Sequence, residues 1–121
     1  MAVRRIRIRT KRIHEAPEAD DGCRVLVDRL WARGLSREQA RVDLWAREIA
    51  PSAELRRWYG HEPDRWPEFR SRYRDELEAN RERLEAILAR LPAGNVTLLY
   101  ASRERRLNNA AVLKEYIESM S

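Results

Sequence analysis

The sequence predicts a single small α/β domain over residues 1–121, with a short, mainly parallel sheet of about three or four strands flanked by helices. Two short apolar runs, Val25–Val27 and Asn95–Tyr100, are rich in β-branched residues and bounded by turn residues, which is typical of buried strands. Segments with helical periodicity separate them, so the connections are crossovers and the strands pair in parallel. A chain of 121 residues has the length of one domain.

The first third of the chain begins with an alternating pattern. From Val3 to Arg9, isoleucine alternates with arginine, which is the period of a half-exposed strand. The segment Thr10–Gly22 contains Pro17 and several acidic residues, and it is predicted to be a loop. The buried strand Val25–Val27 follows directly.

The middle of the chain carries two helix starts. Ser36 and Gln39 have the spacing of a capping box, which predicts a short helix. Residues 42–49 fit either a strand or one face of a helix, and the pattern does not separate the two. Ser52 is a good cap for a second short helix, which we expect to end near Gly60.

The strongest helical pattern begins at Pro63 and continues to Leu91, where Pro92 and Gly94 end it. It predicts one core-packing helix with a charged outer face. Asn108 is the expected N-cap of the last helix. We expect the four tryptophans to lie mostly in the core, at positions Trp31, Trp45, Trp58 and Trp66.

Composition limits the classes of partner. The net charge is +5 and the pI is about 10.0, which favours polyanions, including nucleic acid. However, 20 acidic residues are interleaved with the 25 basic ones, of which only Lys11 and Lys114 are lysines, so codon composition is an alternative reason for the arginine excess. No apolar run approaches the ~18 residues of a membrane span, so we expect a cytoplasmic protein without a membrane partner. The single cysteine, Cys23, excludes an internal disulfide and is interpreted as a small buried hydrophobe.

The candidate site lies where polar residues follow the buried strands, because open α/β sheets bind ligands at their carboxyl edge. We expect Arg29, Arg33 and Arg103 to hold a small anion beside the N-terminus of the last helix. We expect Asp28 to orient Arg29 or Arg103, or alternatively to act as a base, although nearby arginines would lower its pKa and weaken it. The predicted ligand-binding set is Asp28, Arg29, Trp31, Arg33, His61, Tyr100, Arg103 and Asn108.

No metal, cofactor or catalytic residue is predicted. The sequence has no Gly-rich phosphate loop, no recognisable Ser–His–Asp spacing and no zinc pattern. An enzyme acting on a small anionic substrate therefore stays one hypothesis. The alternatives are a nucleic-acid-associated binding protein without catalysis and a module that binds a protein partner through an exposed tryptophan patch. The sequence gives neither the ligand nor the oligomeric state.

Four blocks of the sequence together resemble a known family. Val25–Gly34, Ile49–Trp58, His61–Trp66 and Leu98–Ala101 are similar, in this order, to the YeaO-like branch of the domain-of-unknown-function family 488 (DUF 488). The resemblance extends from about residue 11 to residue 116. It implies an α/β fold with a polar loop after the last strand, and it assigns no reaction.

The chain departs from that family pattern at three positions. Ala32 stands where the pattern has proline, and Cys23 stands where it has an aromatic residue, which weakens a thiol mechanism. Leu107 stands before the asparagine pair where the pattern has histidine. If that histidine serves chemistry in the family, this chain lacks it.

Overall fold

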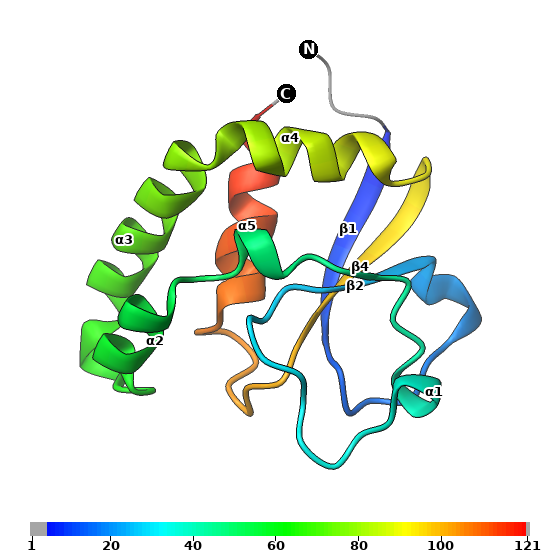
Figure 1. Ribbon diagram of the computed structural model, residues 1–121, viewed down its shortest axis with the longest axis horizontal. Helices are drawn as coiled ribbons and strands as arrows, with labels where there is room; N and C mark the ends of the chain where they lie inside the picture. The colour runs from blue at the N-terminus through cyan, green and yellow to red at the C-terminus, as the bar shows by residue number, and fades with distance from the viewer. Residues whose placement is uncertain (1–4, 121) are drawn as a thin grey trace.

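The computed structural model describes residues 5–120 and contains one four-stranded parallel sheet (Figure 1). The strands are β1 (Ile6–Arg12), β2 (Cys23–Leu26), β3 (Leu44–Trp45) and β4 (Gly94–Tyr100), and their order across the sheet is β1-β4-β2-β3. Every neighbouring pair is parallel, so all carboxyl ends lie at one edge. The predicted α/β class and parallel sheet are confirmed.

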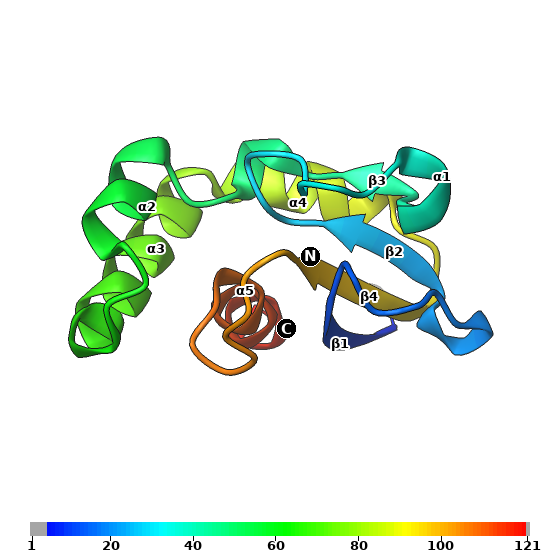
Figure 2. The ribbon, with the colours of Figure 1, turned by 90° about the horizontal axis from the view of Figure 1, so that it is seen from below.

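Five helices complete the fold: α1 (Arg37–Ala40), α2 (Ala53–Tyr59), α3 (Trp66–Ala79), α4 (Arg81–Arg90) and α5 (Asn109–Glu118). Short 3-10 turns form at Ala19–Asp21, Arg47–Ile49 and Pro63–Arg65. Figures 1 and 2 show α5 between the sheet and α3, and α5 contacts both. Within residues 5–120, no helix is long and apolar enough to cross a membrane.

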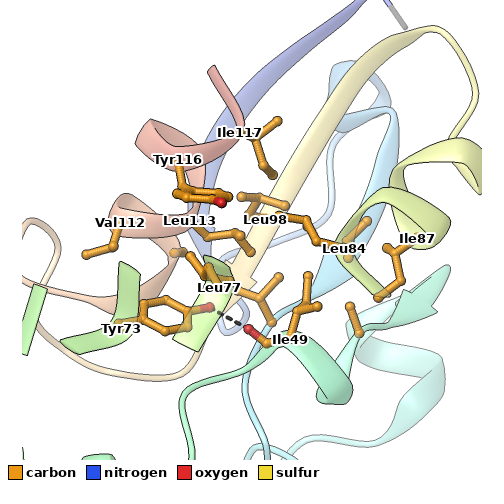
Figure 3. Close-up of a cluster of buried hydrophobic side chains, with 14 of the residues drawn as sticks. Ile49, Tyr73, Leu77, Leu84, Ile87, Leu98, Val112, Leu113, Tyr116 and Ile117 are labelled. Carbon is orange, nitrogen blue, oxygen red and sulfur yellow. Dashed lines mark hydrogen bonds between the residues drawn. The ribbon is translucent and has the colours of Figure 1, made fainter. Parts of the chain in front are cut away.

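Strand alternation divides the core into two clusters, because successive side chains point to opposite faces of a sheet. Val25, Val27 and Leu98 belong to the larger cluster with the buried faces of α2 to α5. Figure 3 shows this cluster, including the hydrogen bond from the Tyr73 hydroxyl to the Ile49 carbonyl at 2.7 Å. On the opposite face, the smaller cluster contains Ile13, Leu26, Ala32, Ala40 and Leu99.

The first strand ends later than predicted, at Arg12 instead of Arg9, while the predicted positions Val3 and Arg4 lie outside the described residues. The sequence favoured a loop there because of Pro17 and the acidic residues that follow. In the structure Lys11 is buried, and its ammonium donates to Asp21 at 3.1 Å and to Glu18 at 2.8 Å. Arg24 completes the group with a contact of 2.6 Å from Nη1 to the other Asp21 oxygen.

Three further predictions need correction or resolution. The predicted helix from Pro63 to Leu91 is two helices, because the backbone at Asn80 leaves the helical region between α3 and α4. Residues 42–49 form the short strand β3 and then the turn Arg47–Ile49. The four tryptophans are half-buried at the surface of the core, and arginine side chains lie over the rings of Trp31, Trp45 and Trp58.

We expect Asp21→Asn to destabilise the fold by about 3–5 kcal/mol, because it leaves Lys11 and Arg24 buried with too little compensating charge. The matched control Asp20→Asn removes an exposed ion pair with Arg9 and should cost less than about 1 kcal/mol. Urea denaturation measures both free energies of unfolding. Equal costs for the two variants would contradict a structural role for the buried cluster.

The same cluster predicts a loss of stability in acid. Burial alone would raise the pKa of Asp21, but hydrogen bonds from the Glu18 N–H, Lys11 and Arg24 together lower it below its ordinary value of 3.8. A lowered folded-state pKa stabilises the protein above the unfolded value, and this contribution is lost as the pH falls through the lowered pKa. The free energy of unfolding measured below pH 3.8 should therefore fall less steeply in Asp21→Asn than in the native protein.

Candidate functional site

One carboxylate ties together the exits of two strands and the start of α5. Asp28 follows β2, and its Oδ2 accepts a hydrogen bond from the Ala101 N–H at 2.9 Å, directly after β4. Its Oδ1 accepts from Asn109 Nδ2 at 3.1 Å, and the same amide group donates to the Val27 carbonyl at 2.8 Å. Because β2 and β4 are adjacent and parallel, this Asp28 clamp lies at the carboxyl edge of the sheet.

The role expected for Asp28 differs in the structure. Its oxygens accept from Ala101 and Asn109, and no ion pair joins it to Arg29 or Arg103. Burial raises the pKa of Asp28, while these two hydrogen bonds and the charge of Arg56 act in the opposite direction without reversing the shift. The prediction of a lowered pKa is wrong, because desolvation outweighs arginines that do not touch the carboxylate.

A cleft of about 270 Å³ opens beside the clamp. Asp28 and Asn109 form its polar wall, and Tyr59 and Phe69 form an aromatic wall. Arg29 and Arg56 contribute positive charge to the lining and His61 contributes an imidazole ring, while Ser102 and Leu107 complete much of the rest. The cleft therefore combines positive charge, hydrogen-bonding groups and flat apolar surface in one small volume.

The two arginines of the cleft have no carboxylate within ion-pair distance among residues 5–120. Arg29 is half-buried, and its described hydrogen bond runs from Nε to the Pro51 carbonyl at 3.3 Å. Arg56 is exposed on α2, and no hydrogen bond of its side chain is present in the described part of the chain. Both guanidinium groups therefore keep donors for a ligand.

The aromatic wall is held in place by packing and by a hydrogen bond. The Tyr59 and Phe69 rings stack with centroids 4.4 Å apart, and the Tyr59 hydroxyl donates to the Leu107 carbonyl at 3.3 Å. His61 lies at the rim with a φ of 58°, in the left-handed region, which costs a non-glycine residue about 1–3 kcal/mol. This backbone conformation places the His61 ring 6.1 Å from the Tyr59 ring.

A second hollow, of about 520 Å³, shares Asp28, Arg56 and Ala101 with the cleft. We name it the arginine groove, because its lining also includes Arg12, Arg33 and Arg103 together with His14 and Trp31. Arg12 donates to backbone carbonyls, with its Nε 3.0 Å from the Ser102 oxygen. Within residues 5–120, none of these arginines forms an ion pair with a carboxylate.

The structure distributes the predicted ligand-binding residues over three places. The cleft is lined by Asp28, Arg29, His61 and Asn108. The arginine groove is lined by Trp31, Arg33 and Arg103, and again by Asp28. Tyr100 lines neither hollow, because it is 2% exposed and packs in the larger core cluster, where burial raises its pKa.

Asn108 has a structural task that the sequence analysis predicted, and this task uses its side chain. Its Oδ1 accepts from the Ala111 N–H at 2.9 Å as the N-cap of α5, and its Nδ2 donates to the Glu104 carbonyl at 2.9 Å. The Tyr100 side chain is therefore too buried to reach a ligand in either hollow, whereas Asn108 keeps one amide hydrogen beyond these two hydrogen bonds.

Sequence reasoning missed Arg56, Tyr59 and Asn109. Asn109 directly follows the recognised N-cap, so its place at the first turn of α5 was a usable signal. Arg56 and Tyr59 belong to the predicted short helix after Ser52, but their approach to the sheet edge depends on how α2 packs against α3. No local pattern reports that packing.

The cleft contains no activated nucleophile among the described residues. Cys23 lies at the opposite end of β2, and burial together with the charge of Asp43 raises the pKa of its thiol. Ser102 lines the cleft, but its hydroxyl accepts a hydrogen bond from the Glu104 N–H at 3.0 Å and is not hydrogen-bonded to His61. Among residues 5–120, the cleft therefore offers no nucleophile hydrogen-bonded to a base.

Comparisons with known proteins agree with the resemblance found in the sequence. A family model described as the inactive DUF488-N3 subclade matches residues 7–121. An uncharacterised protein of Mycobacterium tuberculosis is 42% identical over 116 residues, which cover 95% of this chain and 97% of that protein. The uncharacterised protein YeaO of Escherichia coli is 38% identical over 116 residues, covering 93% and 98%. No solved structure matches the chain.

We expect the carboxyl carbon of Asp28 to titrate above the ordinary value of 3.8 in an NMR pH titration, because burial raises its pKa. Arg56→Gln should raise this pKa further, since the Arg56 charge favours the ionised form. Arg57→Gln is the matched control, because Arg57 lies next to it on α2 and lines neither hollow. A lowered pKa, or equal shifts in both variants, would contradict the described electrostatics.

Proposed function

The chain belongs to the family described as the inactive DUF488-N3 subclade, and we propose that it binds a small anionic ligand at the carboxyl edge of its sheet without catalysing a reaction. One observation carries this proposal. Five arginines without a carboxylate partner among the described residues surround the cleft and the arginine groove, namely Arg12, Arg29, Arg33, Arg56 and Arg103. Such a group repels itself unless an anion neutralises it.

The chemistry of the donors favours an oxyanion. A guanidinium group can donate two parallel hydrogen bonds to a carboxylate or a phosphate, which an ammonium group cannot. Arg29 is anchored through Nε to the Pro51 carbonyl, so its position is fixed before a ligand arrives. A fixed donor loses less conformational entropy on binding.

Asp28 opposes anion binding less than a free carboxylate would. Burial raises the pKa of Asp28, so its ionised form is less favoured than that of an exposed aspartate, although the hydrogen bonds that its two oxygens accept act in the opposite direction. The site therefore keeps a positive balance around an acidic residue that the fold requires.

Two features support binding without catalysis. The family whose model matches the chain is described as an inactive subclade. In addition, Leu107 lines the cleft at the position where the related pattern has histidine, and a leucine side chain can neither transfer a proton nor polarise a substrate.

A thermal-shift screen tests the proposal with phosphate, sulfate, sugar phosphates, nucleotides and carboxylates. A ligand at 100 times its Kd stabilises the native state by about 2.7 kcal/mol, which gives a Tm rise of several degrees for a domain of this size. We expect one ligand class to raise the Tm, and we expect Arg56→Gln and Arg29→Gln to abolish that rise.

Arg57→Gln serves as the control for a general loss of positive charge, and it should keep the full shift. The shift should also depend weakly on salt, because a single small anion releases few counterions. The proposal fails if no anion raises the Tm, or if Arg57→Gln reduces the response as strongly as Arg56→Gln.

A further inference from the structure

The inside of the cleft differs from its rim, and this difference bears on the kind of anion. At about 270 Å³ the cleft lies just below the ~300–1,000 Å³ of typical ligand pockets, so it holds a fragment of about one ring system. Its aromatic wall is the outer part of Tyr59, which is 8% exposed and stacks on the more deeply buried Phe69, and this apolar part would gain nothing from an inorganic phosphate. An aromatic edge of this kind favours a planar ring.

The polar wall of the cleft offers acceptors rather than donors. Both hydrogens of the Asn109 amide are taken by the Val27 carbonyl and by Asp28, whereas its Oδ1 accepts no hydrogen bond within residues 5–120. The Asp28 oxygens accept one hydrogen bond each and retain further lone pairs. A ring that enters the cleft is therefore complementary if it carries an amino group or a ring N–H on its edge.

The arginine groove continues from the cleft at the residues that both share, Asp28, Arg56 and Ala101. A ligand with its ring in the cleft can extend past Arg56 into the groove, which Arg33 and Arg103 also line. Both of these arginines are exposed. This order of an N–H-bearing ring, a short connection and an anion matches the chemistry of a nucleotide.

We propose that the cleft and the arginine groove together bind a nucleotide, with its base against Tyr59 and the edge of the base at Asn109, and with its phosphate on Arg56 and Arg103. This inference rests on the proposed function, because it names the ligand class of the same site. A free mononucleotide and one unit of a single-stranded nucleic acid present the same chemistry, so the experiment includes both.

Isothermal titration calorimetry tests the inference with adenosine monophosphate, adenosine, ribose 5-phosphate, inorganic phosphate and a short oligodeoxyadenylate. Adenosine monophosphate should bind at least about tenfold more tightly than ribose 5-phosphate, since stacking of one base is worth about that factor or more. It should also bind at least about tenfold more tightly than adenosine, which lacks the phosphate that the arginines hold. A single strand is the natural source of the nucleotide if the oligodeoxyadenylate binds more tightly than the mononucleotide. Its binding constant should then fall by about 0.7 log unit per log unit of salt for each contacted phosphate.

Two variants separate the base from the phosphate. His61→Gly removes a ring from the rim and suits a φ of 58°, so it should leave the fold intact. It should weaken the binding of adenosine monophosphate but not that of ribose 5-phosphate. Arg103→Gln should weaken the binding of every phosphate-bearing ligand but not that of adenosine, and Arg57→Gln should change none of the affinities.

The outcomes distinguish this inference from the proposed function. If inorganic phosphate or ribose 5-phosphate binds as tightly as adenosine monophosphate, the nucleotide inference is overturned while anion binding stands. If neither the mononucleotide nor any other anion binds, the proposed function is overturned as well. Tight binding of the oligodeoxyadenylate that is unaffected by both His61→Gly and Arg103→Gln would also overturn the inference, because the strand would then bind elsewhere.

Discussion

The Asp28 clamp is the constraint on which the candidate site depends. It joins the segment after β2 to the first residue after β4 through the Ala101 N–H, and to α5 through Asn109. Removing the carboxylate would leave the half-buried Ala101 N–H and one of the two Asn109 amide hydrogens without an acceptor, and an orphaned group costs up to about 1–3 kcal/mol. The clamp therefore fixes the distance between the strand exits, and with it the shape of the cleft.

Strand β2 has a carboxylate beside each end, the buried Asp21 and the half-buried Asp28, and their surroundings are opposite in kind. Asp21, before the strand, touches Lys11 and Arg24, which lower its pKa and complete a closed structural cluster. Asp28, after the strand, has arginines nearby but forms no ion pair with them, and burial raises its pKa. Positive charge is neutralised at the amino end of the strand and left available at the carboxyl end. This asymmetry is the physical basis of the anion-binding proposal.

The sequence predicted the elements with strong local signals and missed those set by tertiary contacts. The apolar run in β4 and the N-cap Asn108 have local causes, so both were found. Lys11 was assigned to a loop, because its place in β1 depends on pairing with Leu99 of the distant strand β4. At the site, Asp28 and Arg29 followed from the strand-exit rule, whereas Arg56 did not, because the packing of α2 decides where its side chain lies.

Amide NMR mapping with inorganic phosphate tests the central claim, that the carboxyl edge of the sheet binds anions, most directly. Phosphate should shift the amide signals of Arg29, Ala101, Ser102 and Asn109, and it should leave the signals of the arginine-rich outer face of α3 and α4 nearly unchanged. Shifts spread evenly over those helices, with the signals of Ala101 and Asn109 unchanged, would contradict anion binding at this edge. They would indicate nonspecific attraction to a basic protein instead of a built site.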